Sequence, residues 1–341
     1  MSSVDVIIPC YRYGHYLREC VESVLNQSHS DLRVLIIDDA SPDATAEVAR
    51  QLQAEDQRVS FRRHATNQGH IATYNEGIEW LKGQYYLLLS ADDYLLPGAL
   101  RRAALLLDAC PDAGFVFGEA WDLPEGEPEP VAGSIGKSLE NVPHQLLSSR
   151  AFIEYNGCWN RVPTPTAVIR TALQKRVGGY RADLPHAGDM EMWLRLAAHG
   201  AVGRLECKQA VYRRHEQNMS RDYMSAVLPD LSQRKLAVDT LLANCREVLP
   251  DAGLLHHRLT RQLVRHAVGL ASKAFNAGEL ERSRQIADFA AAMDKSVTRS
   301  WPWFALQCKK RIGPRGSRLL TALGGAWRDG LLHSFADVRK P

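Results

Sequence analysis

Short apolar segments alternate with helical segments in the first third of the chain, and this alternation limits the fold more than any other sequence feature. Strand-like apolar runs occupy residues 4–9, 32–37, 59–63, 85–89 and 114–117, and helical spacing of apolar residues occupies 16–25, 44–53, 71–81 and 100–109. Such alternation is typical of βαβ units. Strands that are apolar throughout indicate a mostly parallel sheet with helices on both faces. The sequence therefore predicts an α/β fold.

The pattern changes near residue 228, where long helical segments such as 263–274 and 280–293 replace the strand signals. A chain of 341 residues is long enough for two domains. We therefore predict an α/β domain over residues 1–225 and an all-helical domain over residues 226–341.

Charge, cysteine content and hydropathy limit the classes of partner and compartment. A net charge of +3 is too small to indicate nucleic-acid binding. The 7 cysteines are odd in number and lack CxxC spacing, which favours reduced thiols over a disulfide framework or zinc knuckle. The sequence shows neither a leader pattern nor an apolar run of roughly 20 residues. We expect a cytoplasmic protein.

Polar residues follow three of the predicted strands, at positions 10–12, 38–39 and 92–93. Ligands of parallel α/β sheets bind beyond the carboxyl ends of the strands, so these groups should meet at one edge. The adjacent carboxylates Asp92 and Asp93 repel each other, and a divalent cation would relieve that repulsion. The alternative is that they cap the helix after Pro97. Asp38 and Asp39 likewise suit either a nucleotide ligand or a helix cap.

Several segments, in the same order and with similar spacing, resemble the family 2 glycosyltransferases of GT-A fold. They are VDVIIPCY at 4–11, SVLNQS at 23–28, IIDDASPD at 36–43, NQG at 67–69, NEGI at 75–78 and LSADD at 89–93. Each segment alone is a weak signal, whereas their order together is a strong one. The resemblance covers roughly residues 4–220 and implies a GT-A-type sheet flanked by helices.

The resemblance implies which residues bind the donor. Residues after the first strand and the acidic pair after the second would hold the nucleotide: Pro9, Cys10, Tyr11, Asp38 and Asp39. The family's DxD motif corresponds to Ser90, Ala91 and Asp92, so a serine replaces the first aspartate.

The resemblance also implies a divalent metal, Mn²⁺ or Mg²⁺. Asp92 is the position of the usual ligand, Asp93 can compensate for Ser90, and His215 can complete the site. Arg214 lies beside His215 and suits pairing with a donor phosphate.

Asp189 matches the family's general base, and Gly188 replaces the glutamate that usually precedes it. A carboxylate suits this role because the acceptor hydroxyl loses its proton as the new bond forms. Capping of the following helix is the simpler interpretation, and the two roles are compatible.

The sequence therefore predicts an inverting glycosyltransferase of hexosyltransferase type. The donor would be a UDP- or dTDP-linked sugar, and the acceptor a hydroxyl of a glycan, a lipid-linked glycan or a protein, in bacterial surface-glycan or polysaccharide assembly. The alternative is a catalytically degenerate GT-A domain that binds a nucleotide sugar or a partner. A Rossmann-type dehydrogenase is excluded because no GxGxxG follows the first strand.

Residues 301–341 are basic and contain Trp301, Trp303 and Trp327. They can rest on an anionic membrane surface, as a peripheral contact on the inner face, or form a solvated helical face with the tryptophans packed on the core. The second interpretation is slightly favoured.

Overall fold

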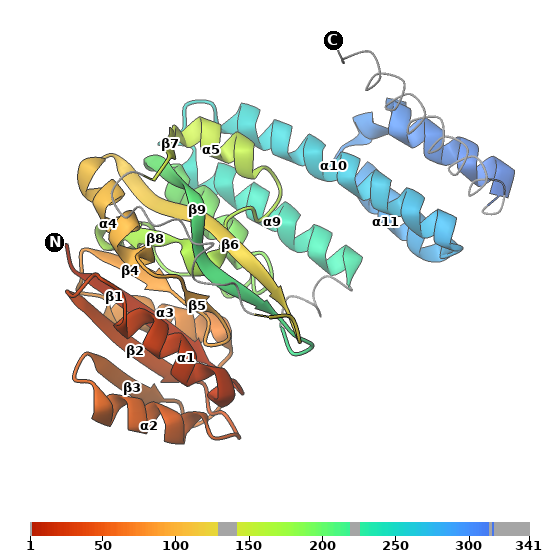
Figure 1. Ribbon diagram of the computed structural model, residues 1–341. Coiled ribbons are helices and arrows are strands. Elements are labelled where there is room, and N and C mark those ends of the chain that lie inside the picture. The colour runs from red at the N-terminus through yellow and green to blue at the C-terminus, as the bar shows by residue number, and fades with distance from the viewer. Residues whose placement is uncertain (1, 129–141, 219–225, 314–315, 317–341) are drawn as a thin grey trace, which may run out of the picture. The chain divides into compact units, whose positions relative to one another are not determined.

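The computed structural model describes residues 2–128, 142–218, 226–313 and 316 (Figure 1). Trp327, most of the basic C-terminal segment and part of the predicted loop 122–136 lie outside these residues. The strands are β1 (Val4–Cys10), β2 (Leu32–Asp38), β3 (Val59–Arg63), β4 (Tyr85–Leu88), β5 (Tyr94–Leu95), β6 (Ala113–Pro124), β7 (His144–Leu147), β8 (Val168–Arg170) and β9 (Ala201–Arg214).

The helices of the α/β part are α1 (Gly14–Leu25), α2 (Thr45–Glu55), α3 (His70–Trp80), α4 (Ala99–Ala109), α5 (Ser149–Asn156), α6 (Thr171–Val177) and α7 (Gly188–Ala197), with a 3-10 turn η2 (Thr164–Thr166). Later in the chain come α9 (Val227–Cys245), α10 (Ala252–Ala277), α11 (Leu280–Met293) and the 3-10 turn η3 (Lys295–Arg299). The predicted α/β fold followed by helices is confirmed.

The strands form one sheet in the order β3-β2-β1-β4-β8-β6-β9-β5, with β7 also paired to β9. β3, β2, β1 and β4 are parallel. Beyond β4 the sheet is mixed, because β8 runs antiparallel to β4 and β6, whereas β6 and β9 are parallel. The parallel pairing predicted from the sequence therefore holds for β3, β2, β1 and β4 and for the pair of β6 and β9, whereas β5, β7 and β8 pair antiparallel.

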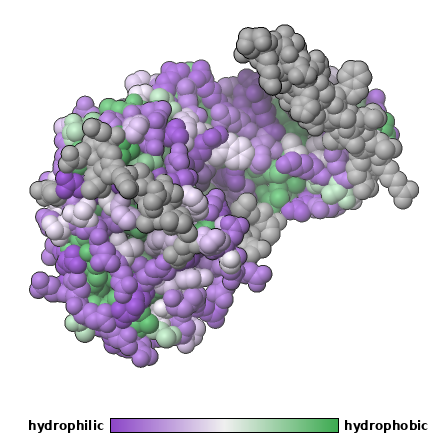
Figure 2. All heavy atoms as spheres, in the orientation of Figure 1, coloured by the Kyte–Doolittle hydropathy of each residue, from purple (hydrophilic) through white to green (hydrophobic). Residues whose placement is uncertain are grey.

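Helices cover both faces of the parallel strands, which explains why these strands are apolar throughout. Ile8 of β1 belongs to a buried cluster with Leu17 of α1 and Leu100 of α4. On the other face, Ile7 lies against α3, so close that a Cβ added at Gly77 would be 2.4 Å from Ile7 Cγ2. The exterior seen in Figure 2 is mainly hydrophilic, as expected when the apolar side chains are inside.

The strand β9 was not predicted from the sequence. Its 14 residues mix buried and accessible positions without strict alternation, and Arg204, Glu206 and Lys208 interrupt its apolar pattern. β9 nevertheless pairs with β6, β7 and β5. Pairing on both edges therefore stabilises a segment whose own pattern is weak.

The chain divides into two compact units, residues 1–256 and 257–341. The first unit includes α9, which packs on α7 and lies beyond the boundary that we expected at residue 225. A separate helical domain that begins at residue 226 stays a prediction. None of the helices within the described ranges combines the length and the apolar character needed to cross a membrane.

The close approach of α1 and α2 yields a stability prediction. A Cβ at Gly14 would lie 2.7 Å from the backbone nitrogen of Thr45, so Gly14→Ala forces two backbones apart. We expect it to lower the free energy of unfolding by about 1–3 kcal/mol, measured by urea denaturation. Gly253→Ala in α10 meets no atom within 4 Å. This control should be neutral or stabilising by up to ~1 kcal/mol, and an equal loss in both variants would contradict the explanation.

Candidate functional site

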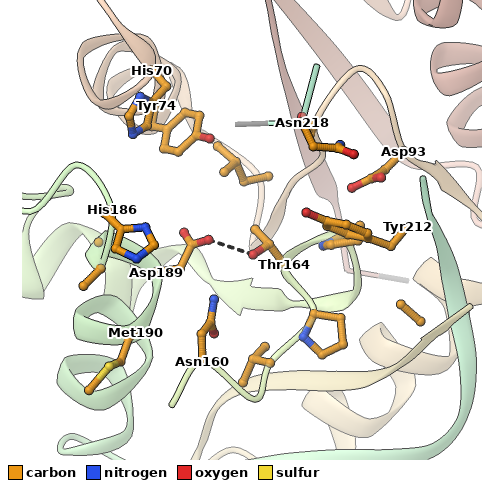
Figure 3. A pocket seen from close by; sticks show the side chains of 18 of the residues that line it. His70, Tyr74, Asp93, Asn160, Thr164, His186, Asp189, Met190, Tyr212 and Asn218 are labelled. Carbon is orange, nitrogen blue, oxygen red and sulfur yellow. Dashed lines mark hydrogen bonds between the residues drawn. The ribbon is translucent and has the colours of Figure 1, made fainter. Parts of the chain in front are cut away.

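A cavity of about 510 Å³ lies at the end of β4 and collects side chains from distant parts of the chain (Figure 3). Its polar lining includes Tyr13, His70, Tyr74, Ser90, Asp92, Asp93, Asn160, Thr164, Tyr180, His186, Asp189, Tyr212, Arg214 and Asn218. Five predicted site residues therefore meet there: Ser90, Asp92, Asp93, Asp189 and Arg214.

Asp92 is buried on the cavity wall, in contact with the segment after β9. Its Oδ2 accepts a hydrogen bond from Asn218 Nδ2 at 3.1 Å and lies 3.2 Å from His215 Nε2. The side chain of Asn218 also fixes this segment, because its Oδ1 accepts from the backbone nitrogen of His215 at 2.6 Å. The other carboxylate oxygen, Oδ1, is buried and has no hydrogen-bond partner among the described residues.

Asp93 also lines the cavity, but its carboxyl serves the fold. Oδ1 of Asp93 accepts a hydrogen bond from the backbone nitrogen of Arg213 at 3.0 Å, which ties β9 to the loop after β4. Burial raises the pKa of Asp93 well above its ordinary value, and the neighbouring charge of Asp92 adds to the shift. One oxygen of Asp93 is thus already engaged by the backbone of β9, which makes this carboxyl less available to a metal.

Asp189 lies in the first turn of α7 and is half-buried. Its Oδ2 accepts a hydrogen bond from Thr164 Oγ1 at 2.9 Å, the dashed line in Figure 3, and Tyr180 also donates to it. Burial raises the pKa of Asp189, although these hydrogen bonds and the nearby His70 and His186 oppose the shift. No side-chain hydrogen bond caps α7. The carboxylate is thus directed at the cavity and Thr164.

Asp189 and the Asp92 group occupy opposite sides of the cavity. Figure 3 shows Asp189 and His186 on one side and Asn218 and Asp93 on the other. A molecule bound between them would touch both.

The predicted nucleotide-binding residues do not line this cavity. Pro9 and Cys10 end β1, and the Cys10 thiol is buried 3.7 Å from Thr45 Oγ1. Burial raises the Cys10 pKa to about 12, so the thiol is neutral. Tyr11 is 39% exposed. Ala91, predicted beside the metal ligand, is fully buried in the core.

Asp38 and Asp39 are both buried at the end of β2 and hold the surrounding loops. Asp38 Oδ1 accepts from the backbone nitrogen of Ser41 at 2.8 Å. Asp39 accepts from the backbone nitrogens of Gln68 at 2.7 Å and Gly69 at 2.9 Å. Gly69 directly precedes α3, whose residues line the cavity, so Asp39 lies beside the cavity rather than in its wall.

The backbone after β1 and β2 is strained. Arg12 and Ala40 have positive φ angles of 66° and 59°, a conformation that side chains other than glycine rarely adopt. The Arg12 backbone nitrogen donates to Ser41 Oγ at 3.0 Å, which joins the two loops. Such strain is concentrated at functional sites, and its position beside Tyr11 and Asp39 favours a ligand at this edge.

Sequence reasoning missed the aromatic and amide residues of the site. Tyr74, Tyr180 and Tyr13 come from α3, a turn and the start of α1, where tyrosines cannot be distinguished from core residues by pattern. Burial raises the pKa of Tyr74 and Tyr180 well above the ordinary value, so both stay neutral phenols. Asn218 lies three residues after the predicted ligand His215, and this nearness in sequence could have identified it as a site residue.

Within the described ranges, no group of three or more His, Cys, Asp or Glu side chains is placed to hold a metal ion. The chain does offer two donors, Asp92 and His215, and Oδ1 of Asp92 is a buried oxygen that lacks a partner. This set fits Mg²⁺ or Mn²⁺, because hard cations commonly bind one or two carboxylates together with substrate phosphates. These two donors are too few to complete a metal site in the absence of the substrate.

The chain is similar to several curated proteins. It is 27% identical over 204 residues to an uncharacterized protein, MT1568, of Mycobacterium tuberculosis, covering 58% of this chain and 63% of the relative. It is 33% identical over 102 residues to an uncharacterized glycosyltransferase of Haemophilus influenzae, covering 30% and 41%. It is 38% identical over 97 residues to a chondroitin synthase of Pasteurella multocida, covering 28% and 10%. The chain thus spans less than two thirds of the length of each.

The fold resembles that of S. aureus TarS, residues 1–349, with a TM-score of 0.56, 17% identity and 91% of each chain covered. TarS in complex with UDP gives a TM-score of 0.55 at the same coverage. At this identity the likeness shows the fold alone, and it agrees with the expected GT-A type. The model of glycosyl transferase family 2 matches residues 5–175, half of the 341 residues. With Asp92 and Asp189 facing one cavity of this fold, the chain belongs to glycosyl transferase family 2.

Proposed function

We propose that the chain transfers a sugar, with inversion, from a nucleoside-diphosphate donor to an acceptor hydroxyl. One observation carries the proposal: Asp92, which is buried, and Asp189, which is half-buried, are far apart in sequence and line a single cavity. A single displacement needs a base on the acceptor side and charge stabilisation at the leaving diphosphate, on the other side of the reacting carbon.

Asp189 takes the acceptor proton. Its raised pKa makes it a stronger base than an ordinary aspartate, and the hydrogen bond from Thr164 holds the carboxylate in place. The acceptor oxygen attacks the anomeric carbon, and the bond to the diphosphate breaks on the opposite face. Tyr180 and Tyr74, neutral phenols beside Asp189, exclude water from the base.

Asp92 and His215 would hold a divalent metal, Mn²⁺ or Mg²⁺, which would supply charge neutralisation for the departing diphosphate. Arg214, at the cavity rim, is half exposed and can exchange its ion pair with Asp122 for a donor phosphate. Ser90 provides a hydroxyl to the donor ribose.

The donor is UDP-linked, with a dTDP-linked sugar as the alternative. TarS, whose fold this chain resembles, binds UDP and UDP-GlcNAc. The nucleotide base of the donor lies at the ends of β1 and β2, near Pro9, Cys10, Tyr11, Asp38 and Asp39. The strained backbone at Arg12 and Ala40 supports this placement.

The acceptor is the hydroxyl of a glycan, a lipid-linked glycan or a protein, and the reaction belongs to bacterial surface-glycan or polysaccharide assembly in the cytoplasm. The similarity to a chondroitin synthase of Pasteurella multocida supports a polysaccharide context. The competing proposal is a degenerate binding module, favoured by Ser90 and Gly188 where the family has acidic residues. Hydrolysis of UDP-sugar by the purified chain would exclude it.

Asp189→Asn tests the base. We expect kcat for sugar transfer to fall by about 10²- to 10⁴-fold while UDP affinity changes little. The folded pKa of Asp189 lies above the unfolded value, so its charge lowers stability at neutral pH, and that loss vanishes below about pH 4. The asparagine variant should therefore melt at the same or a higher temperature than the wild type.

The raised pKa of Asp189 also determines how activity falls at acidic pH. The base works only when ionised, so kcat should fall as the pH drops through a pKa higher than the ordinary 3.8 of an aspartate. Turnover by the asparagine variant at the wild-type rate, or an acid limb that survives the substitution unchanged, would contradict the assignment of Asp189.

Paired variants test the metal ligand. Asp92→Asn should raise the Mn²⁺ concentration needed for half-maximal UDP binding by about tenfold or more, since tenfold corresponds to only ~1.4 kcal/mol. Asp93→Asn is the matched control, because an amide oxygen can still accept from Arg213. Calorimetric titration of UDP at fixed Mn²⁺ concentrations measures both. A larger effect at Asp93 would reverse the two roles.

We also propose a peripheral contact with an anionic membrane, on the inner face. Residues 301–313 are helical, and Trp301, Phe304 and Ile312 are exposed on one side of this helix at 75%, 56% and 48%. Lys309 and Arg311 accompany this apolar stripe. Exposed aromatic residues beside cations are typical of helices that lie in a membrane interface.

Vesicle flotation tests this contact. The wild type should float with phosphatidylserine-containing vesicles, and the double substitution Trp301→Ala with Phe304→Ala should reduce the floating fraction several-fold. Leu105→Ala, at a residue of α4 that is 42% exposed, is the control. Equal flotation of all three proteins, or none by the wild type, would exclude the stripe as a membrane contact.

A further inference from the structure

His64 lies between two carboxylates at the edge of the parallel sheet. Its Nδ1 is 2.7 Å from Asp39 Oδ1 and its Nε2 is 2.7 Å from Glu76 Oε2. The ring is only 6% exposed. A neutral imidazole carries one N–H, so only the protonated ring can donate to both carboxylates at once. The contacts therefore indicate an imidazolium.

The charges around the ring favour that state. Burial alone lowers the pKa of His64, but the hydrogen bonds to Asp39 and Glu76 outweigh burial, and the pKa is raised above its ordinary value. Glu76, on α3, also pairs with Arg62 of β3 at 3.0 Å. This arginine is 48% exposed, so solvent weakens its opposing effect.

The other charges nearby belong to a second pair. The backbone nitrogen of His64 donates to the carbonyl oxygen of Asp38 at 2.9 Å. The Asp38 carboxylate pairs with Arg63 Nε at 3.1 Å and also accepts from the backbone nitrogen of Ser41 at 2.8 Å. Asp39 and Glu76 are therefore the charges that His64 balances.

Asp39 retains one place for a ligand. Its Oδ1 accepts from His64 and from the backbone nitrogen of Gln68, and its Oδ2 accepts from the backbone nitrogen of Gly69. A carboxylate offers about four acceptor positions in all, so one on Oδ2 is left. An N–H on the edge of a nucleotide base is a donor of the required kind.

We propose that His64 is a positioning residue of the donor site, whose ring holds the Asp39 carboxylate in place so that its remaining acceptor position meets the nucleotide base. The inference rests on the proposed function, which assigns Asp39 to the base. Because Glu76 anchors the far side of the ring, α3 is tied to the base site through His64. The same helix lines the cavity with His70 and Tyr74.

Loss of the proton disrupts this arrangement. A neutral ring can donate to Asp39 or to Glu76 but not to both. Loss of the proton also makes the site more negative by one charge, which opposes binding of an anionic nucleoside diphosphate. Nucleotide affinity therefore falls as the pH rises through the pKa of His64. Glu76→Gln removes one of the carboxylates that raise this pKa, so the fall should move to lower pH.

UDP binding to the full chain with Mg²⁺, measured by calorimetry from pH 6.5 to 9, tests the inference. Near pH 6.5, His64→Gln should weaken UDP binding by about tenfold, the scale of a lost hydrogen bond to a charged group. The difference from wild type should shrink at the basic end. His256→Gln breaks a similar contact, with Asp239 at 2.9 Å, outside the cavity lining. This control should keep the wild-type profile.

Each remaining outcome decides between the proposals. If wild type fails to bind UDP, the proposed donor and the inference fall together. If wild type binds UDP and His64→Gln keeps both its affinity and pH profile, the inference alone is overturned. NMR titration of the His64 ring adds a reading independent of UDP. A pKa at or below the ordinary ~6.5, or one that Glu76→Gln leaves unchanged, also overturns it.

Discussion

Parallel pairing of β2, β1 and β4 is the constraint on which the rest of the structure depends. The register aligns Cys10 with Asp38, so the carboxyl ends of β1 and β2 lie side by side, and β4 ends next to them. The pairing thereby brings the polar groups that follow these apolar strands to one edge of the sheet, although they are far apart in the sequence. Helices on both faces exclude water from the strands, which leaves this edge as the accessible place for chemistry.

The site contains carboxylates that the fold alone does not require. Asp189 is half-buried with a raised pKa, and Oδ1 of Asp92 is buried without a partner in the described part of the chain. Both arrangements oppose stability, whereas Asp38 and Asp39 are held by backbone nitrogens and basic side chains, with one acceptor position of Asp39 left for a ligand. The contrast separates the two carboxylates that line the cavity from the two that shape the loops beside it. It is the physical ground for giving Asp92 and Asp189 the central roles.

Many elements of the fold could be predicted because they are decided locally. The strand 59–63 coincides with β3, and the helix 280–293 with α11. β9 escaped prediction because its charged residues mask the apolar alternation, and pairing with β6 and β7 on distant segments stabilises it instead. The mixed half of the sheet follows from the same long-range pairing, which no local pattern reports.

The sequence by itself determined the order of strands and helices and the acidic residues that follow the strands, since both depend on neighbours in the chain. Only the tertiary structure decided what each acidic residue does. Asp93 is occupied by the backbone of Arg213, Asp92 is joined by His215 and Asn218, and Asp189 receives Thr164. Apart from the turn that places Thr164 near α7, these partners lie more than a hundred residues away. Their side chains meet only because the strands pair and the core closes around them.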